Sequence, residues 1–335
     1  MQMAVRVGVI GAGIMGADHA RILAGSVAGA KLVAVSDPDE GRRNAVASDF
    51  GVEQTYGDAF DLIGDGEVDA VIVASPDPTH KAYALACLDA GKPVLCEKPL
   101  ATSPAECLDL VRREVEIGRR LIQVGFMRRF DPGYVAMKSA LDSGGLGDAL
   151  IFHCVHRNKQ EIGYTTSEGL IANSAVHEID IARWLLEDEP ARAIVVAPKS
   201  SKLASVRDPQ ILILEMAGGP IVEVEIFINA QYGYDVRGEL VCERATVALE
   251  PRSDMTIRRD GLEGIRHGTD WRGRFADAYR IELQAWIDAF GAGGAAGASA
   301  WDGYAATAIA AAGVEALTNG APTDIHLEPK PAFYT

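Results

Sequence analysis

The sequence predicts an α/β protein, with a doubly wound parallel sheet in its N-terminal part and an α+β domain with a large, mostly antiparallel open sheet in its C-terminal part. The chain has 335 residues, enough for two hydrophobic cores. Short β-branched runs alternate with helical stretches up to residue 125, and alternating strands with few helices between them follow. We therefore expect one domain over residues 1–125 and a second over residues 126–335.

The first domain is expected to hold parallel strands that are buried on both faces. Each candidate strand is a short and nearly continuous apolar run, and helical stretches separate the runs. The runs are V-R-V-G-V-I (5–10), K-L-V-A-V-S (31–36), A-V-I-V-A-S (70–75), P-V-L-C (93–96) and L-I-Q-V-G (121–125). This order of strand and helix is typical of a Rossmann-type sheet.

The second domain is expected to hold a sheet with one covered face. Its candidate strands alternate apolar and polar residues. They are I-F-H-C-V-H-R (151–157), A-I-V-V-A (193–197), Q-I-L-I-L-E-M (210–216), P-I-V-E-V-E-I-F-I (220–228) and E-L-V-C-E-R-A-T-V-A-L (239–249). A helical period returns over 277–290, and another helix is expected from near Asp302. The other face of an open sheet needs covering, so we expect a homo-oligomer, a dimer or a tetramer.

Charge and composition restrict the class of partner. A formal net charge of -15 disfavours a nucleic-acid partner, because phosphate binding needs a concentrated positive surface, and it leaves a small molecule as the expected partner. The alanine-rich stretch 305–317 is too short for a membrane span, and the N-terminal apolar run is interpreted as strand and turn rather than a leader. Five cysteines without C-x-x-C spacing suggest neither disulfides nor a zinc site, so we expect a reducing, cytoplasmic compartment. No metal is expected, because His153 and His156 are poorly spaced to share a ligand face with carboxylates.

A glycine motif follows the first strand. Gly11, Gly13 and Gly16 form G-A-G-I-M-G, and a helix is expected to begin near Ile14. These glycines, with Ile14 and Met15 among them, are the candidates to contact the cofactor. Such glycines permit a tight turn, a close approach of the backbone to a pyrophosphate and close packing of helix on strand. The alternative is a plain sharp turn.

An acidic residue ends the second strand. Asp37 stands at the distance from the glycines at which a carboxylate accepts hydrogen bonds from the adenosine ribose. A carboxylate there repels a 2'-phosphate, so we expect NAD rather than NADP, although Arg42 and Arg43 nearby would soften that preference. The alternative is that Asp37 only caps the next helix.

Longer strings resemble one family over the whole chain. They are A-S-P-D-P-T-H (74–80), C-E-K-P-L (96–100), G-F-M-R-R-F-D (125–131), N-S-A-V-H-E-I-D (173–180) and Y-R-I-E-L-Q-A-W (279–286), and together they resemble the Gfo/Idh/MocA oxidoreductases, most closely those that oxidise inositols at carbon 2. The resemblance implies that Ser75, Pro76 and His80 lie beside the cofactor, Glu97 at the nicotinamide ribose, and Lys98 between nicotinamide and substrate.

A lysine in that place suits the oxidation of a secondary alcohol. The hydroxyl loses a proton as hydride leaves the carbon, and a cation stabilises the developing alkoxide. Lys98 follows an apolar strand and precedes Pro99, at the carboxyl end of a strand, where open sheets bind ligands. The alternative is a solvated loop lysine.

A second group of polar residues is expected on one helix. Asn173, His177 and Asp180 are spaced to share a stripe with Trp184, and His177 is the candidate general base. Many relatives carry aspartate at position 173. Asparagine cannot stabilise an imidazolium by charge, so either His177 acts with help from Lys98 or the substrate preference has changed.

The substrate hydroxyls need fixed donors and acceptors, and four residues are candidates. They are Arg128, His156, Asn158 and Tyr234. Arg128 is not readily distinguished from Arg129 next to it, and Tyr234 is as well explained as an aromatic at the rim of a loop.

The expected reaction is oxidation of myo-inositol to its 2-keto form with reduction of NAD. Another inositol isomer or a sugar such as glucose is the alternative within the family. A non-catalytic dinucleotide-binding sensor is the alternative from another class, which Lys98 and His177 disfavour because a sensor needs neither.

Overall fold

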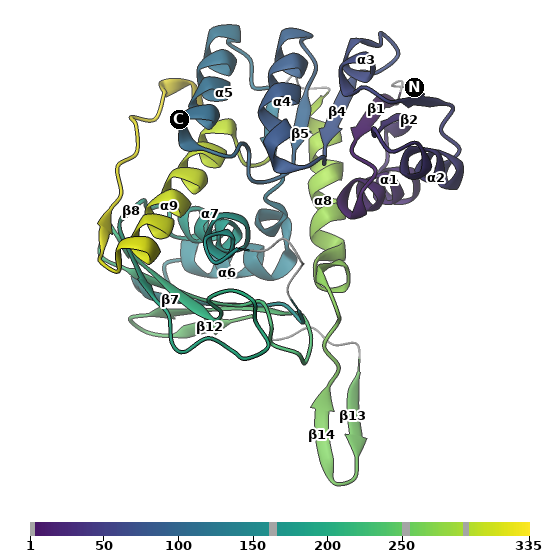
Figure 1. The fold of residues 1–335 in the computed structure, drawn as a ribbon. Helices are drawn as coiled ribbons and strands as arrows, with labels where there is room; N and C mark the ends of the chain where they lie inside the picture. The colour runs from purple at the N-terminus through teal and green to yellow at the C-terminus, as the bar shows by residue number, and fades with distance from the viewer. Residues whose placement is uncertain (1–3, 161–165, 250–254, 291–294) are drawn as a thin grey trace. The chain divides into compact units, whose positions relative to one another are not determined.

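The computed structural model describes residues 4–160, 166–249, 255–290 and 295–335. The chain divides into two compact units. The first unit comprises Met1–Phe130, Asp277–Thr307 and Glu328–Thr335, and the second comprises Asp131–Ala276 and Ala308–Leu327. Figure 1 shows the helices and strands of both units.

The first unit is built on a six-stranded sheet in the order β3-β2-β1-β4-β5-β6, with every strand pair parallel. Its strands are β1 (Val5–Ile10), β2 (Ala30–Ser36), β3 (Gln54–Tyr56), β4 (Ala70–Val73), β5 (Val94–Cys96) and β6 (Ile122–Val124). Its helices before residue 131 are α1 (Ile14–Ser26), α2 (Glu40–Phe50), α3 (Ala59–Gly64), α4 (His80–Asp89) and α5 (Pro104–Ile117), with 3-10 turns η1 (Asp77–Thr79) and η2 (Met127–Phe130). The predicted doubly wound sheet is confirmed.

Five of these strands coincide with predicted runs, and β3 was not predicted. The strand Gln54–Tyr56 has three residues, none of them fully buried, so it lacks the apolar run of its neighbours. The strand order reverses at β1, which pairs with β2 on one side and β4 on the other. Ligands of open α/β sheets bind at the carboxyl ends of the strands beside such a reversal.

The second unit is built on a seven-stranded sheet in the order β12-β11-β7-β10-β9-β8-β15. Its strands are β7 (Ala149–Arg157), β8 (Pro190–Val196), β9 (Gln210–Met216), β10 (Ile221–Phe227), β11 (Asp235–Cys242), β12 (Thr246–Ala248) and β15 (Thr323–Asp324). Only β7 and β10 pair in parallel, so the predicted mostly antiparallel sheet is confirmed.

One face of this sheet is covered by helices. Side chains along β7 alternate, with Phe152, Cys154 and His156 buried and their neighbours half-buried. The helices α6 (Pro132–Asp142) and α7 (Val176–Leu186) and the π-helix η3 (Leu170–Ala175) belong to this unit, and Figure 1 shows α6 and α7 on one side of the sheet.

One predicted strand and one predicted helix differ from their expected ranges. A turn divides the strand, and the helix contains a kink. The run 239–249 belongs to two strands, β11 and β12, which form an antiparallel pair. The helix expected from residue 277 begins earlier, as α8 (Trp271–Phe290), with non-helical angles at Phe275. The helix expected near Asp302 is α9 (Ala300–Asn319). At its start the Asp302 carboxylate accepts the N–H of Ser299, and the Ser299 hydroxyl oxygen accepts the N–H of Asp302, as in a capping box.

The division into units differs from a linear division at residue 126. Residues from Asp277 onward in α8 belong to the first unit again, because this part of the helix packs against α1 and the loop after α1. The rings of His19 and Tyr279 meet edge to face at 5.8 Å, and the side-chain amide of Gln284 exchanges two hydrogen bonds with the backbone of Ala28. A helix far along the sequence therefore completes the first core.

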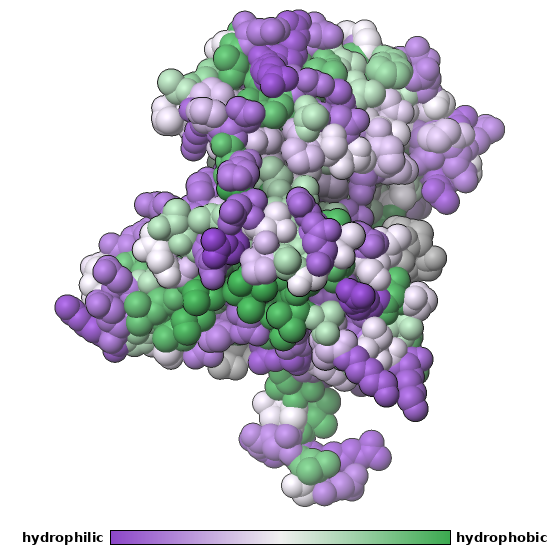
Figure 2. All heavy atoms as spheres, turned by 60° about the vertical axis from the view of Figure 1, so that its left-hand side comes forward, coloured by the Kyte–Doolittle hydropathy of each residue, from purple (hydrophilic) through white to green (hydrophobic). Residues whose placement is uncertain are grey.

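A separate two-stranded hairpin, β13 (Thr256–Arg259) with β14 (Leu262–Ile265), was not predicted, and all its residues are exposed. Figure 2 shows hydrophobic and hydrophilic residues side by side on this hairpin at the bottom of the view.

Among the described residues, no helix is both long enough and apolar enough to cross a membrane.

Candidate active site

The glycine loop of the first unit leaves space for a ligand at the start of α1. Gly11 has a φ of +94°, and a Cβ there would lie 2.6 Å from the carbonyl oxygen of Ala74. A Cβ on Gly16 would overlap the carbonyl oxygen of Gly11, whereas one on Gly13 would meet nothing within 4 Å. No side chain caps the N-terminus of α1, whose N–H groups can therefore bind an anion.

Asp37 is held on this loop by its carboxylate. Oδ2 accepts a hydrogen bond from the N–H of Ala12 at 2.8 Å, and Oδ1 accepts one from the N–H of Asp39 at 2.9 Å. The cap of α2 is Asp39, which accepts from the N–H of Arg42, so the alternative that Asp37 only caps that helix is wrong. Each carboxylate oxygen keeps a lone pair for a second donor.

These residues fit a dinucleotide. The close-packed glycines bring backbone N–H groups to a pyrophosphate site, and Asp37 supplies the acceptor for ribose hydroxyls. Ile14, at the first position of α1, is 66% exposed, and a large apolar side chain open at this place can cover a bound ring. Met15 beside it is half-buried.

The segment after β5 carries the predicted lysine. Glu97 is 6% exposed, and its Oε1 lies 2.8 Å from Nε2 of His19, which comes from α1 and has no exposed surface. Burial acts to raise the pKa of the Glu97 carboxyl, but the hydrogen bond and charge of His19 and the nearby Lys98 outweigh it, so the pKa is lowered. Glu97 is therefore a carboxylate at neutral pH. Lys98 itself is half-buried, and its peptide bond to Pro99 is cis.

The segment after β4 is tied to the segment after β5. His80, 1% exposed, places Nε2 at 2.8 Å from the carbonyl oxygen of Ser75 and Nδ1 at 2.7 Å from that of Pro99. The Ser75 hydroxyl lies 2.6 Å from that of Thr79, which donates to the carbonyl oxygen of Pro76. His80 therefore links the two signature strings through backbone carbonyls.

The second unit places Asn173 and His177 in different kinds of helix. Asn173 lies exposed in the π-helix η3, and His177, 9% exposed, lies in the first turn of α7. The predicted shared stripe assumed continuous α-helical spacing, whereas Asn173 lies in a π-turn of wider period, so the stripe that it would share with His177 stays a prediction. His177, Asp180 and Trp184 do lie on one α-helix, where Asp180 is fully buried.

The substrate candidates of the second unit include two that lie close together. His156 on β7 and Tyr234 before β11 meet edge to face, with ring centroids 6.3 Å apart. Nδ1 of His156 lies 3.0 Å from both carboxylate oxygens of the fully buried Glu178, which turns the ring's other nitrogen away from that carboxylate. Asn158, just after β7, has a buried Oδ1 with no hydrogen-bond partner among the described residues, so it can accept from a hydroxyl.

The predicted residues thus fall into two sets. The first unit holds the glycine loop, Asp37 and the segments 75–80 and 97–98, and the second holds 156–158, 173–177 and Tyr234. Arg128 lies in η2 of the first unit, so it is the one substrate candidate outside the second unit. Its side chain is 1% exposed.

Sequence reasoning did not single out His19 or Glu178. Both are polar residues beside motif residues, His19 three positions after Gly16 and Glu178 directly after His177. Neither position has a pattern that reveals full burial, so only the packing identifies them.

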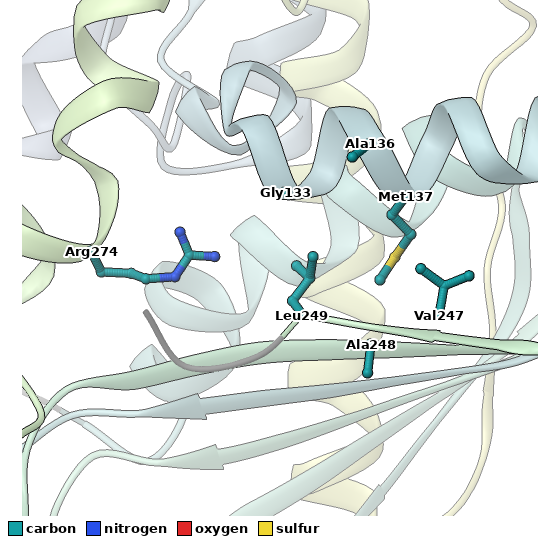
Figure 3. A pocket seen from close by; sticks show the side chains of 7 residues that line it. All are labelled: Gly133, Ala136, Met137, Val247, Ala248, Leu249 and Arg274. Atoms are coloured by element: carbon teal, nitrogen blue, oxygen red, sulfur yellow. The ribbon is translucent and has the colours of Figure 1, made fainter. Parts of the chain in front are cut away.

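A pocket of about 330 Å³ lies elsewhere in the second unit. It is lined by Gly133, Ala136, Met137, Val247, Ala248, Leu249 and Arg274, as Figure 3 shows, and it contains none of the predicted site residues. Within the described part of the chain, no group of three or more His, Cys, Asp or Glu side chains has a geometry that could hold a metal ion.

The glycine loop, the carboxylate and the strand-end lysine define a dinucleotide-dependent oxidoreductase. Residues 5–126 match the model of an oxidoreductase family with an NAD-binding Rossmann fold, and residues 134–248 match the GFO/IDH/MocA C-terminal domain. The chain belongs to the GFO/IDH/MocA oxidoreductase family, and the predictions of this family and of NAD as cofactor are confirmed.

The chain is similar over its whole length to proteins named as inositol dehydrogenases. It is 56% identical to inositol 2-dehydrogenase 1 of Saccharopolyspora erythraea and 43% identical to inositol 2-dehydrogenase of Burkholderia ambifaria, with 99% of each chain covered. It is 34% identical to myo-inositol dehydrogenase from Lactobacillus casei, whose crystal structure contains NAD(H) and myo-inositol, with a TM-score of 0.95 over 99% of this chain and all of that one.

Proposed function

We propose that this chain oxidises myo-inositol at carbon 2 to the 2-keto product and transfers the hydride to NAD. The observation that carries the proposal is 56% identity over 99% of both chains to an inositol 2-dehydrogenase, together with the strand-end lysine that such a reaction needs. NAD supplies the hydride acceptor, and the protein supplies binding, orientation and control of the proton.

The first unit supports binding and orientation of the cofactor. The N-terminus of α1 would hold the pyrophosphate, Asp37 the adenosine ribose, and Ser75, Pro76 and Glu97 the nicotinamide side. Lys98, as a cation, would stabilise the alkoxide that forms as the hydroxyl proton leaves.

The second unit supports recognition of hydroxyls and removal of the proton. His177 is the proposed base, because a neutral imidazole accepts a proton near neutral pH. Asn173 would orient a hydroxyl with its amide, and its exposed position leaves it accessible to a ligand. His156, Asn158 and Tyr234 are the proposed substrate contacts, with Arg128 of the first unit as a fourth.

The test is NADH formation with the purified full chain across myo-, scyllo- and chiro-inositol, glucose and simple 2-hydroxy acids. The expected result is turnover of myo-inositol with a kcat/KM at least about tenfold above that of any other compound, because a site that pairs each hydroxyl rejects a changed stereocentre. Higher efficiency with another isomer or with glucose would contradict the substrate assignment and leave the dehydrogenase class intact.

We further propose that the chain is a cytoplasmic homo-oligomer. The outer side chains of the seven-stranded sheet are half-buried or exposed and include Ile221, and the hairpin β13–β14 exposes Leu262 at 76%. Exposed apolar side chains on a sheet and on a hairpin favour a second copy of the chain as their cover. Light scattering coupled to size exclusion tests this, and a mass of one chain at micromolar concentration would contradict it.

A further inference from the structure

Two buried histidines hold the residues on either side of Lys98. Nε2 of His19 lies 2.8 Å from Oε1 of Glu97, and Nδ1 of His80 lies 2.7 Å from the carbonyl oxygen of Pro99. Both rings are at most 1% exposed. The backbone that carries Lys98 is therefore held by one helix on its N-terminal side and by another on its C-terminal side.

The Glu97 carboxylate that forms the first of these contacts is itself confined. Its Oε2 accepts the N–H of Lys98 at 3.3 Å. Gly125 faces it so closely that a Cβ there would lie 3.2 Å from Cδ of Glu97. Because Glu97 is a carboxylate, Nε2 of His19 must be the protonated nitrogen that donates to it. The hydrogen bond therefore has one direction and little room to rearrange.

We propose that His19 and His80 are positioning residues for the dehydrogenation, acting through Glu97 and Pro99 to keep the Lys98 amine in one place. This rests on the proposed function, in which Lys98 stabilises the alkoxide. A lysine side chain has several rotatable bonds, so its reach depends on where its backbone stands. A displacement of about 1 Å in a reacting group costs about 100-fold in rate, which is why such support has a large effect.

His19 gives the sharper test because it has one hydrogen bond to remove. Its other ring nitrogen, Nδ1, has no hydrogen-bond partner among the described residues. His19→Leu removes the donor and keeps most of the bulk, whereas His19→Gln places an amide N–H where Nε2–H stood. The ring also packs against Tyr279, so a purely structural role has to be measured separately.

A control exists in the second unit. His153 on β7 has Nδ1 at 2.7 Å from Oε2 of Glu223, which is also a histidine–carboxylate contact, outside the proposed site and more exposed than that of His19. His153→Leu therefore removes a similar hydrogen bond without touching the segment around Lys98.

The experiment compares the parent, His19→Leu, His19→Gln and His153→Leu as full chains. It measures kcat and KM for the polyol, the Kd of NADH by its fluorescence, and the midpoint of thermal unfolding. For His19→Leu we expect kcat to fall about 10- to 100-fold, with KM and the NADH Kd within about threefold of the parent. His19→Gln is expected to return kcat to within about fivefold of the parent, and His153→Leu to stay within about twofold.

Two results would overturn the proposal. One is a kcat within about twofold of the parent in His19→Leu. The other is a loss of kcat that His19→Gln does not restore and that comes with an equal loss of NADH binding or of thermal stability, which is the signature of a structural role.

A readout without turnover separates this inference from the proposed function. If the parent oxidises none of the polyols, the proposed function fails, and acetylation of the protein without cofactor then tests the positioning of Lys98. Peptide mass spectrometry gives the rate at Lys98 relative to Lys92, and His19→Leu is expected to change this ratio at least about threefold because the surroundings of an amine set its reactivity. An unchanged ratio would overturn the inference.

Discussion

At the scale of single residues, the proposed chemistry of the first unit depends on two charged side chains at strand ends. Asp37 follows β2 and Lys98 follows β5. Both could be singled out from the sequence, because Asp37 stands directly after an apolar run and Lys98 stands two residues after one, each in a motif. Their partners, Ala12 and Asp39 for the aspartate and the buried histidines around the lysine, come from the packing.

Replacing Lys98 tests its role as the cation. In Lys98→Met we expect kcat for myo-inositol to fall about 100- to 10,000-fold, because the developing alkoxide loses its stabilising charge. The Kd of NADH is expected to stay within about threefold, since backbone groups and Asp37 carry most of the cofactor binding. Lys31→Met, at an exposed position of β2, is the control and should match the parent. A kcat within a few-fold of the parent would refute the assignment of Lys98.

Replacing Asp37 tests the preference for NAD. The parent is expected to use NAD in strong preference to NADP, because the carboxylate binds ribose hydroxyls and repels a 2'-phosphate. In Asp37→Ser we expect kcat/KM for NAD to fall about 10- to 100-fold, the equivalent of one charged hydrogen bond, while the efficiency with NADP rises. Steady-state rates with both cofactors measure this, and equal use of NADP by the parent would contradict it.

At the scale of elements, a hydrogen bond to a buried carboxylate anchors the C-terminal turn to the first core. The 3-10 turn η4 (Ala332–Tyr334) brings the hydroxyl of Tyr334 to 2.6 Å from Oε2 of Glu114 on α5. Glu114 has no exposed surface, and its Oε1 accepts the N–H groups of Leu121 and Ile122 at the start of β6. Burial raises the pKa of the Glu114 carboxyl, because the charged form loses its contact with water. The hydrogen bonds that Glu114 accepts therefore stabilise the buried carboxylate.

Removing the Tyr334 hydroxyl should therefore destabilise the protein. For Tyr334→Phe we expect the free energy of unfolding to fall by about 1–3 kcal/mol, because a buried acceptor loses its partner. Urea unfolding followed by circular dichroism measures this. The control is Tyr56→Phe, whose hydroxyl donates to the half-buried Asp65 at 2.7 Å, where water can replace it. A larger loss in the control would show that burial of Glu114 is not the cause.

Also at the scale of elements, the sequence patterns predicted some helix and strand boundaries better than others. The apolar run of β9 (Gln210–Met216) coincides with the predicted range because both ends meet polar or turn residues. The π-helix η3 was missed, since a widened turn changes the period without changing the residue types. The α-helical spacing expected at Asn173 was therefore wrong, and the stripe that it would share with His177 stays a prediction.

At the scale of the whole molecule, the five cysteines are all buried as free thiols. Burial raises the pKa of Cys87 to about 12 and that of Cys107 to about 11, and it raises the pKa of Cys96 well above its usual value. A raised pKa leaves the thiol neutral at pH 8, and a neutral buried thiol is a poor nucleophile.

We therefore expect the native protein to react with a disulfide reagent such as DTNB only slowly at pH 8. In guanidinium chloride, all five thiols of each chain should react at once. Absorbance of the released thiolate counts them. Rapid reaction of one or more thiols in the native protein would contradict the observed burial.

The sequence by itself determined the fold class of both domains, the nucleotide loop with Asp37, and the strand-end lysine. It did so because strand periodicity, glycine spacing and charge at a strand end are local properties that each short segment carries alone. Only the tertiary structure decided that α8 returns to the first unit, that Asn173 lies in a π-turn and that His19 and His80 hold the two sides of Lys98. These features depend on packing between residues far apart in the chain, such as the 78 positions between His19 and Glu97, and no local pattern records such contacts.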